Sequence, residues 1–156
     1  MIIRLVPLFG HWLAAFALAL AAARAAPAPF RAGAAAVEIT PPKLPVRIAG
    51  GFLEKAGTEI TDPLYVRCLV LADGGTKIAF AIVDTCMMTR SLIDEAKRLA
   101  SARCAIPTDR MMVSATHTHS SMGGFWNAPS APLFMGKYRQ PIFDLLVAGC
   151  SNAVKE

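Results

Sequence analysis

The fold is decided by residues 64–84, LYVRCLVLADGGTKIAFAIVD. Two runs rich in β-branched and aromatic residues, 64–72 and 77–84, flank the tetrapeptide Asp73-Gly74-Gly75-Thr76. Glycines in such a short connection supply the positive φ angles of a tight turn, so the two runs are predicted to form an antiparallel hairpin. The segment 78–83, IAFAIV, is apolar at every position, which predicts a strand covered on both faces.

The periodicity then changes to that of a helix. Between Ser91 and Arg103 the apolar residues fall on one stripe and the charged residues on the other, and Ser91 with Asp94 forms a predicted N-terminal capping pair. Pro107 ends this segment, and residues 111–116 follow as a second apolar strand. Strand, helix and strand in this order predict two parallel strands joined by a right-handed crossover.

Shorter segments complete the prediction. Residues 35–40 are typical of a strand that Pro41-Pro42 ends, and residues 47–52 are extended but loosened by Gly50-Gly51. Pro141 begins a final helix whose pattern runs to the last residues without a terminating glycine. The fold class is therefore α/β, a mixed sheet with a leading β-hairpin and a strand-helix-strand crossover, and we expect it to be part of a larger α/β domain.

The composition points to export. The 156 residues are 54% apolar and only 17% charged, which excludes a disordered chain. Much of the excess lies at the N-terminus, where Arg4 precedes an apolar run at 12–23 and small residues near Ala25. We expect residues 1–25 to be a signal peptide cleaved after Ala25 and the protein to be secreted or periplasmic; the alternative is an uncleaved anchor, for which the apolar run is short.

The distribution of charge limits the classes of partner to be expected, and the positions of the cysteines bear on whether a disulfide forms. Lysines and arginines are scattered singly or in pairs such as Lys97-Arg98, so no nucleic-acid partner is expected, whereas weak attraction to an anionic membrane surface stays open. The four cysteines include no CxxC pair. Export permits a disulfide, but Cys68, Cys86 and Cys150 lie in or next to apolar segments where a free cysteine serves as a small core residue.

The chemically distinctive residues follow the second parallel strand, in Thr116-His117-Thr118-His119-Ser120. Side chains two residues apart on extended backbone leave the same face, so both imidazoles can reach one point. Imidazole suits zinc, although a pair of hydrogen-bonded surface histidines has the same spacing.

Ligands of parallel sheets bind at the carboxyl ends of strands, where these histidines are predicted to lie. Asp84 ends the neighbouring strand, so its carboxylate is expected either to orient a histidine or to bind a metal, or else to cap the following helix. Gly123-Gly124 permits close approach of the backbone to a ligand, or simply a turn.

From about Gly33 onward, these segments together resemble the N-terminal catalytic domain of neutral/alkaline, non-lysosomal ceramidases. The resemblance is strongest in Ser114–Ser120 and includes Asp62-Pro63-Leu64-Tyr65-Val66-Arg67, next to the hairpin. The resemblance implies a zinc-dependent amidohydrolase that splits the N-acyl bond of ceramide. It implies that His117 is a zinc ligand, that His119 assists the developing oxyanion, and that the Gly50-Gly51-Phe52 segment lies near the substrate amide, with Gly51 as a substrate-binding residue.

This sequence departs from the family pattern in two features of the predicted zinc site. Ser121-Met122 stands between the histidine motif and the glycines, where the family has Gly-Pro directly. The family's remaining zinc ligands, a histidine, a glutamate and a tyrosine, lie downstream, and no histidine follows His119. A catalytic zinc normally has three protein ligands. We therefore expect residues 26–156 to be the N-terminal portion of a ceramidase-like domain that binds zinc weakly and is inactive alone. The alternatives are an exported hydrolase of another amide or ester and a non-catalytic binding domain.

Overall fold

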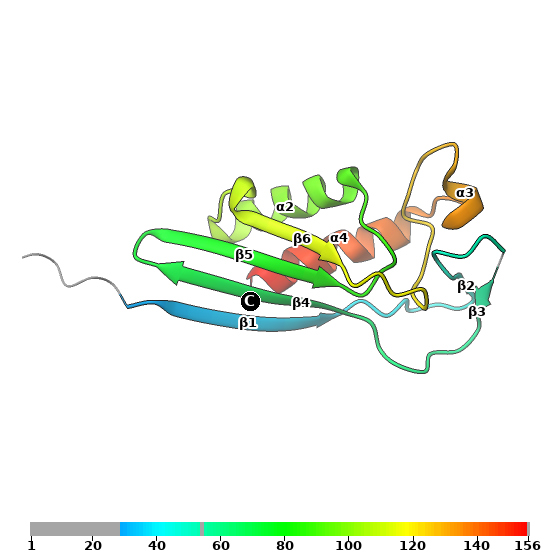
Figure 1. Cartoon of the computed structure of the whole chain (residues 1–156), viewed down its shortest axis with the longest axis horizontal. Coiled ribbons are helices and arrows are strands. Elements are labelled where there is room, and N and C mark those ends of the chain that lie inside the picture. Colours follow the sequence, from blue (N-terminus) through cyan, green and yellow to red (C-terminus); the bar gives the residue numbers. More distant parts are fainter. Residues whose placement is uncertain (1–28, 54, 156) are drawn as a thin grey trace, which may run out of the picture.

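A four-stranded mixed sheet with two helices on one face forms the body of the protein (Figure 1). The computed structural model describes residues 29–53 and 55–155, so the predicted signal peptide lies outside the described residues. The strands are β1 (Arg31–Glu38), β4 (Tyr65–Asp73), β5 (Thr76–Val83) and β6 (Met111–Ala115), in the order β1-β4-β5-β6. A two-stranded sheet of β2 (Val46–Arg47) and β3 (Ala56–Gly57) lies beside one end of the larger sheet.

The predicted hairpin and the predicted strand-helix-strand connection between two parallel strands are both confirmed. β4 and β5 pair antiparallel through the turn between Asp73 and Thr76, while β5 and β6 pair parallel with Val83 opposite Ala115. The connection between β5 and β6 contains α2 (Arg90–Cys104) and a short 3₁₀ turn at Thr108–Arg110. The carboxyl ends of β5 and β6 therefore lie at the same edge of the sheet, which is the end where β2 and β3 lie (Figure 1).

Several predicted boundaries and one cap need correction. β1 begins at Arg31 rather than Ala35, because it pairs along nearly the whole of β4. The N-cap of α2 is Thr89, whose hydroxyl accepts a hydrogen bond from the backbone N–H of Leu92; Ser91 lies inside the helix. Asp84 is accordingly not the cap of this helix. A short helix that was not predicted, α3 (Ala131–Phe134), precedes α4 (Gln140–Lys155).

The core lies between the sheet and its two helices. α4 packs across β1, β4 and β5, and α2 packs against α4. Alternate residues of β5 point into this core and are at most 1% exposed, namely Ala79, Ala81 and Val83. Burial of such aliphatic side chains is the main stabilising contribution, about 25 cal/mol for each Å² of apolar surface.

The opposite face of the sheet is less covered than the sequence predicted. Ile78, Phe80 and Ile82 of β5 are only half-buried, and Leu69 and Met112 on the neighbouring strands are 41% and 46% exposed. Both long helices lie on one side, and no described helix packs over the other, so the apolar character of β5 on both faces is not matched by burial on both faces.

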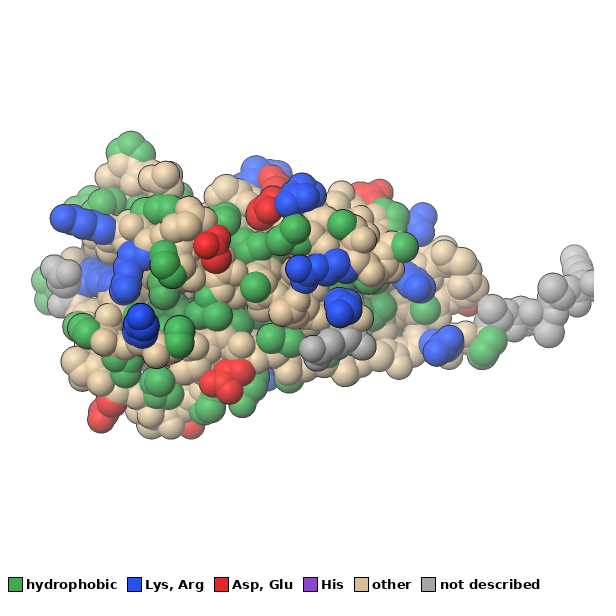
Figure 2. Space-filling model, turned by 180° about the vertical axis from the view of Figure 1, so that it is seen from behind, with side chains coloured by type: hydrophobic (Ala, Val, Ile, Leu, Met, Phe, Trp, Pro, Cys, Tyr) green, Lys and Arg blue, Asp and Glu red, His purple; other side chains and the backbone are tan. Residues whose placement is uncertain are grey.

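The charge on the surface and the apolar character of the helices are relevant to nucleic-acid and membrane partners. On the side of the molecule opposite to that of Figure 1, lysine and arginine side chains lie dispersed among apolar, polar and acidic ones (Figure 2). Among residues 29–53 and 55–155, none of the helices has both the length and the apolar character needed to cross a membrane.

All four cysteines are free thiols, and Cys68, Cys86 and Cys150 are buried as predicted for core residues.

Candidate metal centre

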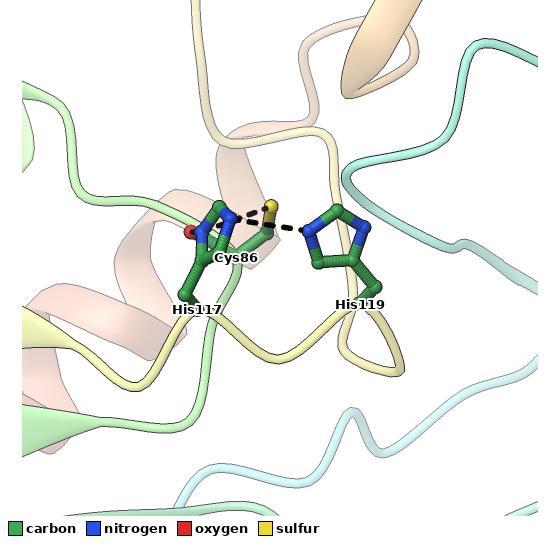
Figure 3. A group of neighbouring side chains, drawn as sticks. All are labelled: Cys86, His117 and His119. Atoms are coloured by element: carbon green, nitrogen blue, oxygen red, sulfur yellow. Dashed lines mark hydrogen bonds between the residues drawn. The ribbon is translucent and has the colours of Figure 1, made fainter.

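Three potential metal ligands meet beyond the carboxyl ends of β5 and β6: Cys86, His117 and His119 (Figure 3). One ligand atom from each of these residues lies within 4.8 Å of those of the other two. Cys86 follows β5 and is buried, whereas both histidines follow β6 and are solvent-exposed. The group is therefore anchored on the sulfur side and accessible on the imidazole side.

The two histidines converge, but not through regular extended backbone as the sequence suggested. β6 ends at Ala115, and His117 has a φ of 62°, in the left-handed region that few residues other than glycine adopt. The rings are nearly perpendicular, at 87°, and their Nε2 atoms lie 3.3 Å apart. A strained backbone at an exposed pair of polar side chains is typical of a functional site.

The protonation of His117 follows from its hydrogen bond. Its Nδ1 lies 2.6 Å from the carbonyl oxygen of Cys86. A carbonyl oxygen can only accept, so Nδ1 carries the proton and donates it. In the neutral ring Nε2 then presents a lone pair, and a backbone carbonyl that fixes the tautomer in this way is the usual support of a metal-binding histidine.

The spacing of the two Nε2 atoms fits zinc. With Zn–N distances of about 2.0–2.1 Å and tetrahedral angles, two imidazole ligands of one ion have nitrogens roughly 3.3–3.4 Å apart. The observed separation is 3.3 Å. His117 and His119 can thus bind one ion with little rearrangement.

Cys86 is not suited to act as a nucleophile. Its sulfur lies 3.8 Å from Nδ1 of His117, but that nitrogen carries a proton and therefore cannot take one from the thiol. Burial also raises the pKa of the Cys86 thiol, which keeps it protonated at neutral pH. The apolar surroundings of Cys86 predict only a core residue, whereas its position two residues after Asp84, at a strand end, is the signal that it lies in the site.

Gly50 forms one wall of the centre. Its φ is 88°, and a Cβ added there would lie 2.7 Å from the sulfur of Cys86 and 2.7 Å from Nδ1 of His119. Its position is set by backbone hydrogen bonds from Ala49 to Ser121 and from Gly123 to Arg47, at 2.9 and 2.7 Å. Only a residue without a side chain allows these two ligands to approach as they do.

Gly51 lines a neighbouring apolar cavity. The cavity has a volume of about 500 Å³ and reaches His119; it is lined by Ile48, Ala49, Gly51, Phe52, Leu53, Lys55 and His119. Phe52 and Leu53 are 85% and 86% exposed, and the Phe52 ring meets Phe134 edge-on with centroids 5.4 Å apart. The Gly50-Gly51-Phe52 segment thus lies beside the imidazoles, and Gly50 rather than Gly51 contacts them.

Asp84 engages a different strand. Its carboxylate accepts hydrogen bonds from the backbone N–H of Tyr65 at 3.0 Å and from the guanidinium of Arg67 at 2.7 Å. None of the hydrogen bonds found among the described residues joins Asp84 to a histidine. Gly123 and Gly124 likewise approach the chain itself: a Cβ at Gly123 would collide with the backbone of Met135.

Comparison with known proteins agrees with the predicted resemblance. Residues 30–156 match the family described as neutral/alkaline non-lysosomal ceramidase, N-terminal. The chain is 31% identical over 104 residues to a neutral ceramidase of Drosophila pseudoobscura pseudoobscura and 29% identical over 102 residues to one of Drosophila melanogaster. These alignments cover 64% and 63% of this chain but only 15% and 14% of the relatives.

Solved structures show the same fold. A crystal structure of neutral ceramidase from Pseudomonas aeruginosa superimposes with a TM-score of 0.74 at 23% identity, covering 81% of this chain and 21% of that one. A ceramidase complexed with C2 gives a TM-score of 0.67 at 22% identity over 80% of this chain and 20% of the other. The chain belongs to the neutral/alkaline non-lysosomal ceramidase family, whose N-terminal domain it matches from residue 30 to residue 156.

Proposed function

We propose that the chain is the N-terminal part of a zinc-dependent amidohydrolase that cleaves the N-acyl bond of ceramide or a similar N-acyl lipid. The observation that carries the proposal is the 3.3 Å separation of the His117 and His119 Nε2 atoms. It is supported by the family membership and by the fixed tautomer of His117.

His117 and His119 are the residues that would hold the ion. Zinc at such a position polarises a carbonyl group and lowers the pKa of water, which is the chemistry that amide hydrolysis at neutral pH requires. The resemblance assigned His119 to the oxyanion instead. The short distance between the two Nε2 atoms favours a ligand role, because an ion held by the Nε2 of His117 would also be within reach of His119 Nε2.

The apolar cavity beside His119 is suited to an acyl chain. Its lining is mainly aliphatic and aromatic, and Gly51 lets the substrate approach the backbone there. The exposed Phe52 and Leu53, with Lys55 next to them, also support contact with a lipid surface, where apolar side chains enter the bilayer boundary and a cation pairs with anionic head groups.

Asp84 is proposed as a positioning residue. Its carboxylate fixes the end of β5 to Tyr65 and Arg67 of β4, and Cys86, whose carbonyl orients His117, follows two residues later. Substituting asparagine would remove the charge from the pair with Arg67 while leaving the shape of the side chain almost unchanged.

The test is hydrolysis of a fluorescent ceramide by the complete gene product, before and after removal of metal with a chelator. We expect release of the fatty acid, loss of activity on chelation and recovery with zinc. Activity that survives complete zinc removal contradicts the proposal. A panel of short acyl amides and esters then establishes the substrate class, and turnover of the panel without turnover of ceramide identifies a hydrolase of a different amide or ester.

Export is proposed together with this function. The predicted cleavage after Ala25 gives a mature chain that begins at Ala26. Mass spectrometry of the secreted or periplasmic protein is expected to show this N-terminus; retention of Met1 contradicts it.

A further inference from the structure

We propose that a cavity at the end of the sheet opposite to the metal centre binds a fatty acid, that is, one hydrocarbon chain with an anionic head. This sheet-end cavity is lined by residues 31–35 of β1, by parts of β4 and β5, by residues 153–155 at the end of α4, and by Cys104 and Ile106. It lies where β1 begins and β4 turns into β5, far from β2 and β3 (Figure 1). The site goes beyond the proposed function, because binding there requires neither a metal ion nor turnover.

Three cationic side chains lie at the mouth of the sheet-end cavity. Arg31, Lys77 and Lys155 line it and are exposed. Arg31 pairs with Ala72 of β4, and Ala72 pairs in turn with Lys77 of β5. Because residues directly opposite one another in paired strands point to the same face, Arg31 and Lys77 flank one small residue. Neither of the ion pairs found among the described residues involves these three cations, so their charge is available to an anion.

The cavity becomes apolar toward the interior. The next rows of this face of the sheet are Gly33 opposite Val70 and Ala35 opposite Cys68. Cys68 is 5% exposed, and Ile106, which is 2% exposed, lines the cavity from the side of the helices. A pocket with an apolar interior and cations at its mouth is complementary to a molecule with a hydrocarbon tail and a negatively charged head.

Gly33 provides room for the tail. A Cβ added at Gly33 would meet no atom within 4 Å, although this residue lies within a paired strand. The absent side chain therefore leaves open space on the cavity wall, and no neighbouring group of the protein fills it. Glycine inside a strand often marks a place where a ligand approaches the backbone closely.

Charge and volume together select the occupant. Among the described residues that line the cavity, none is acidic. The C-terminal ends of α2 and α4 each contribute a partial negative charge of about half an elementary charge, which three full positive charges outweigh. The volume is about 340 Å³, near the lower end of the roughly 300–1,000 Å³ that ligand sites occupy, and it suits one alkyl chain rather than the two chains of a phospholipid. A fatty acid, which hydrolysis of an N-acyl lipid releases, has this chemistry.

Titration of the complete gene product with dodecanoate, below the concentration at which it forms micelles, provides the test. Isothermal titration calorimetry measures the affinity. Dodecanol, which has the same tail without the charge, should bind roughly 10-fold more weakly, because its head group makes no ion pairs with the three cations. Acetate, which has the head group without the tail, should show no measurable binding.

Two variants with matched controls locate the ligand. Gly33→Leu fills the cavity and should weaken dodecanoate binding by at least about 10-fold, because the tail loses its apolar contact. Gly75→Leu should bind like the wild type, since Gly75 also has open space around it but lies outside the cavity. Lys77→Gln should weaken binding roughly 2- to 5-fold, whereas Lys43→Gln, at an exposed lysine outside the cavity, should not. Far-ultraviolet circular dichroism checks that each variant is folded, and Lys77→Gln keeps the test decisive if Gly33→Leu does not fold.

The outcomes separate this inference from the proposed function. A wild-type protein that binds no dodecanoate, a folded Gly33→Leu variant with unchanged affinity, or dodecanol bound as tightly as dodecanoate overturns the inference. Binding that Phe52→Ala weakens and Gly33→Leu does not would place the ligand beside His119, which also overturns the inference and agrees with the proposed function. A gene product that hydrolyses no acyl substrate contradicts the proposed function, whereas the titration decides the sheet-end cavity independently of turnover.

Discussion

The carbonyl oxygen of Cys86 accepts a hydrogen bond of 2.6 Å from Nδ1 of His117, and this contact joins the end of β5 to the loop after β6. It fixes the tautomer and direction of an imidazole whose Nε2 faces that of His119. Because both strands end at the same edge of a parallel pair, the contact forms where such sheets generally bind their ligands. The chemistry of this site depends on the register between β5 and β6.

The first prediction concerns the role of His119. His119→Ala should lose bound zinc as His117→Ala does, because the 3.3 Å separation of the two Nε2 atoms would let both bind one ion. Elemental analysis beside kcat measures it. Ser120→Ala, in the same exposed loop, should retain the metal. Retained zinc with kcat lowered roughly 10²- to 10³-fold would assign His119 to the oxyanion instead.

The second prediction concerns Gly50. Gly50→Ala should disrupt the metal site, since the new methyl group would overlap both Cys86 and His119 and the φ of 88° disfavours a side chain, at a cost of about 1–3 kcal/mol. Gly75→Ala, which meets no atom within 4 Å, is the control. Metal affinity and the melting temperature are the measurements, and an unchanged affinity in Gly50→Ala would show that Gly50 is not a wall of the site.

The third prediction concerns the apolar cavity. Phe52→Ala should raise KM for a long-chain substrate roughly 10- to 100-fold, because burial of a phenylalanine against an acyl chain contributes about 1.5–3 kcal/mol. Phe30→Ala removes an equally aromatic, 65% exposed side chain next to the start of β1, at the far end of the sheet (Figure 1). Kinetics with acyl chains of increasing length measure the effect. An equal KM increase in both variants would argue against the cavity as the acyl site.

The fourth prediction concerns stability at alkaline pH. Burial raises the pKa of the Cys150 thiol to about 12 and that of Cys68 to about 11, from an ordinary 9.0. Above about pH 9 the unfolded chain releases thiol protons that the folded chain retains, so the free energy of unfolding should fall as pH rises from about 9 to 11. Urea denaturation at several pH values measures this slope.

Cys150→Ala should reduce that slope, because the thiol with a pKa raised to about 12 is removed. Leu146→Ala, a buried position on the same helix, should lower stability at every pH without changing the slope. Equal slopes in Cys150→Ala and the wild type would show that the buried thiol does not titrate as predicted.

The sequence predicted the parts of the fold that depend on local pattern. The glycine turn at 73–76 and the alternation on either side were sufficient for the β4–β5 hairpin, and the change of period at Ser91 was sufficient for the crossover. Boundaries set by pairing were less accurate: β1 extends to Arg31 because β4 provides partners there. The sequence overpredicted the burial of β5, because an apolar pattern shows that both faces of a strand can be buried but does not show that another element packs on each face.

The site was predicted only in part, for a physical reason. The HxH spacing indicated converging imidazoles, and the structure confirms that they meet. The ring positions, however, depend on the left-handed backbone of His117. The approach of Gly50 and Cys86 to the histidines depends on tertiary hydrogen bonds from His117 to Cys86, 31 residues apart in sequence, and from Ala49 to Ser121, on either side of the long intervening segment. A local sequence pattern does not show contacts between distant segments. The sequence therefore predicted Cys86 as a core residue and gave Gly50 no role of its own.

The zinc content of the complete gene product tests the central claim most directly. After equilibration with zinc and removal of loosely bound ions by dialysis, elemental analysis should find about one zinc per wild-type molecule and almost none in His117→Ala. A complete wild-type protein without zinc, or a His117→Ala variant with as much zinc as the wild type, would contradict the account.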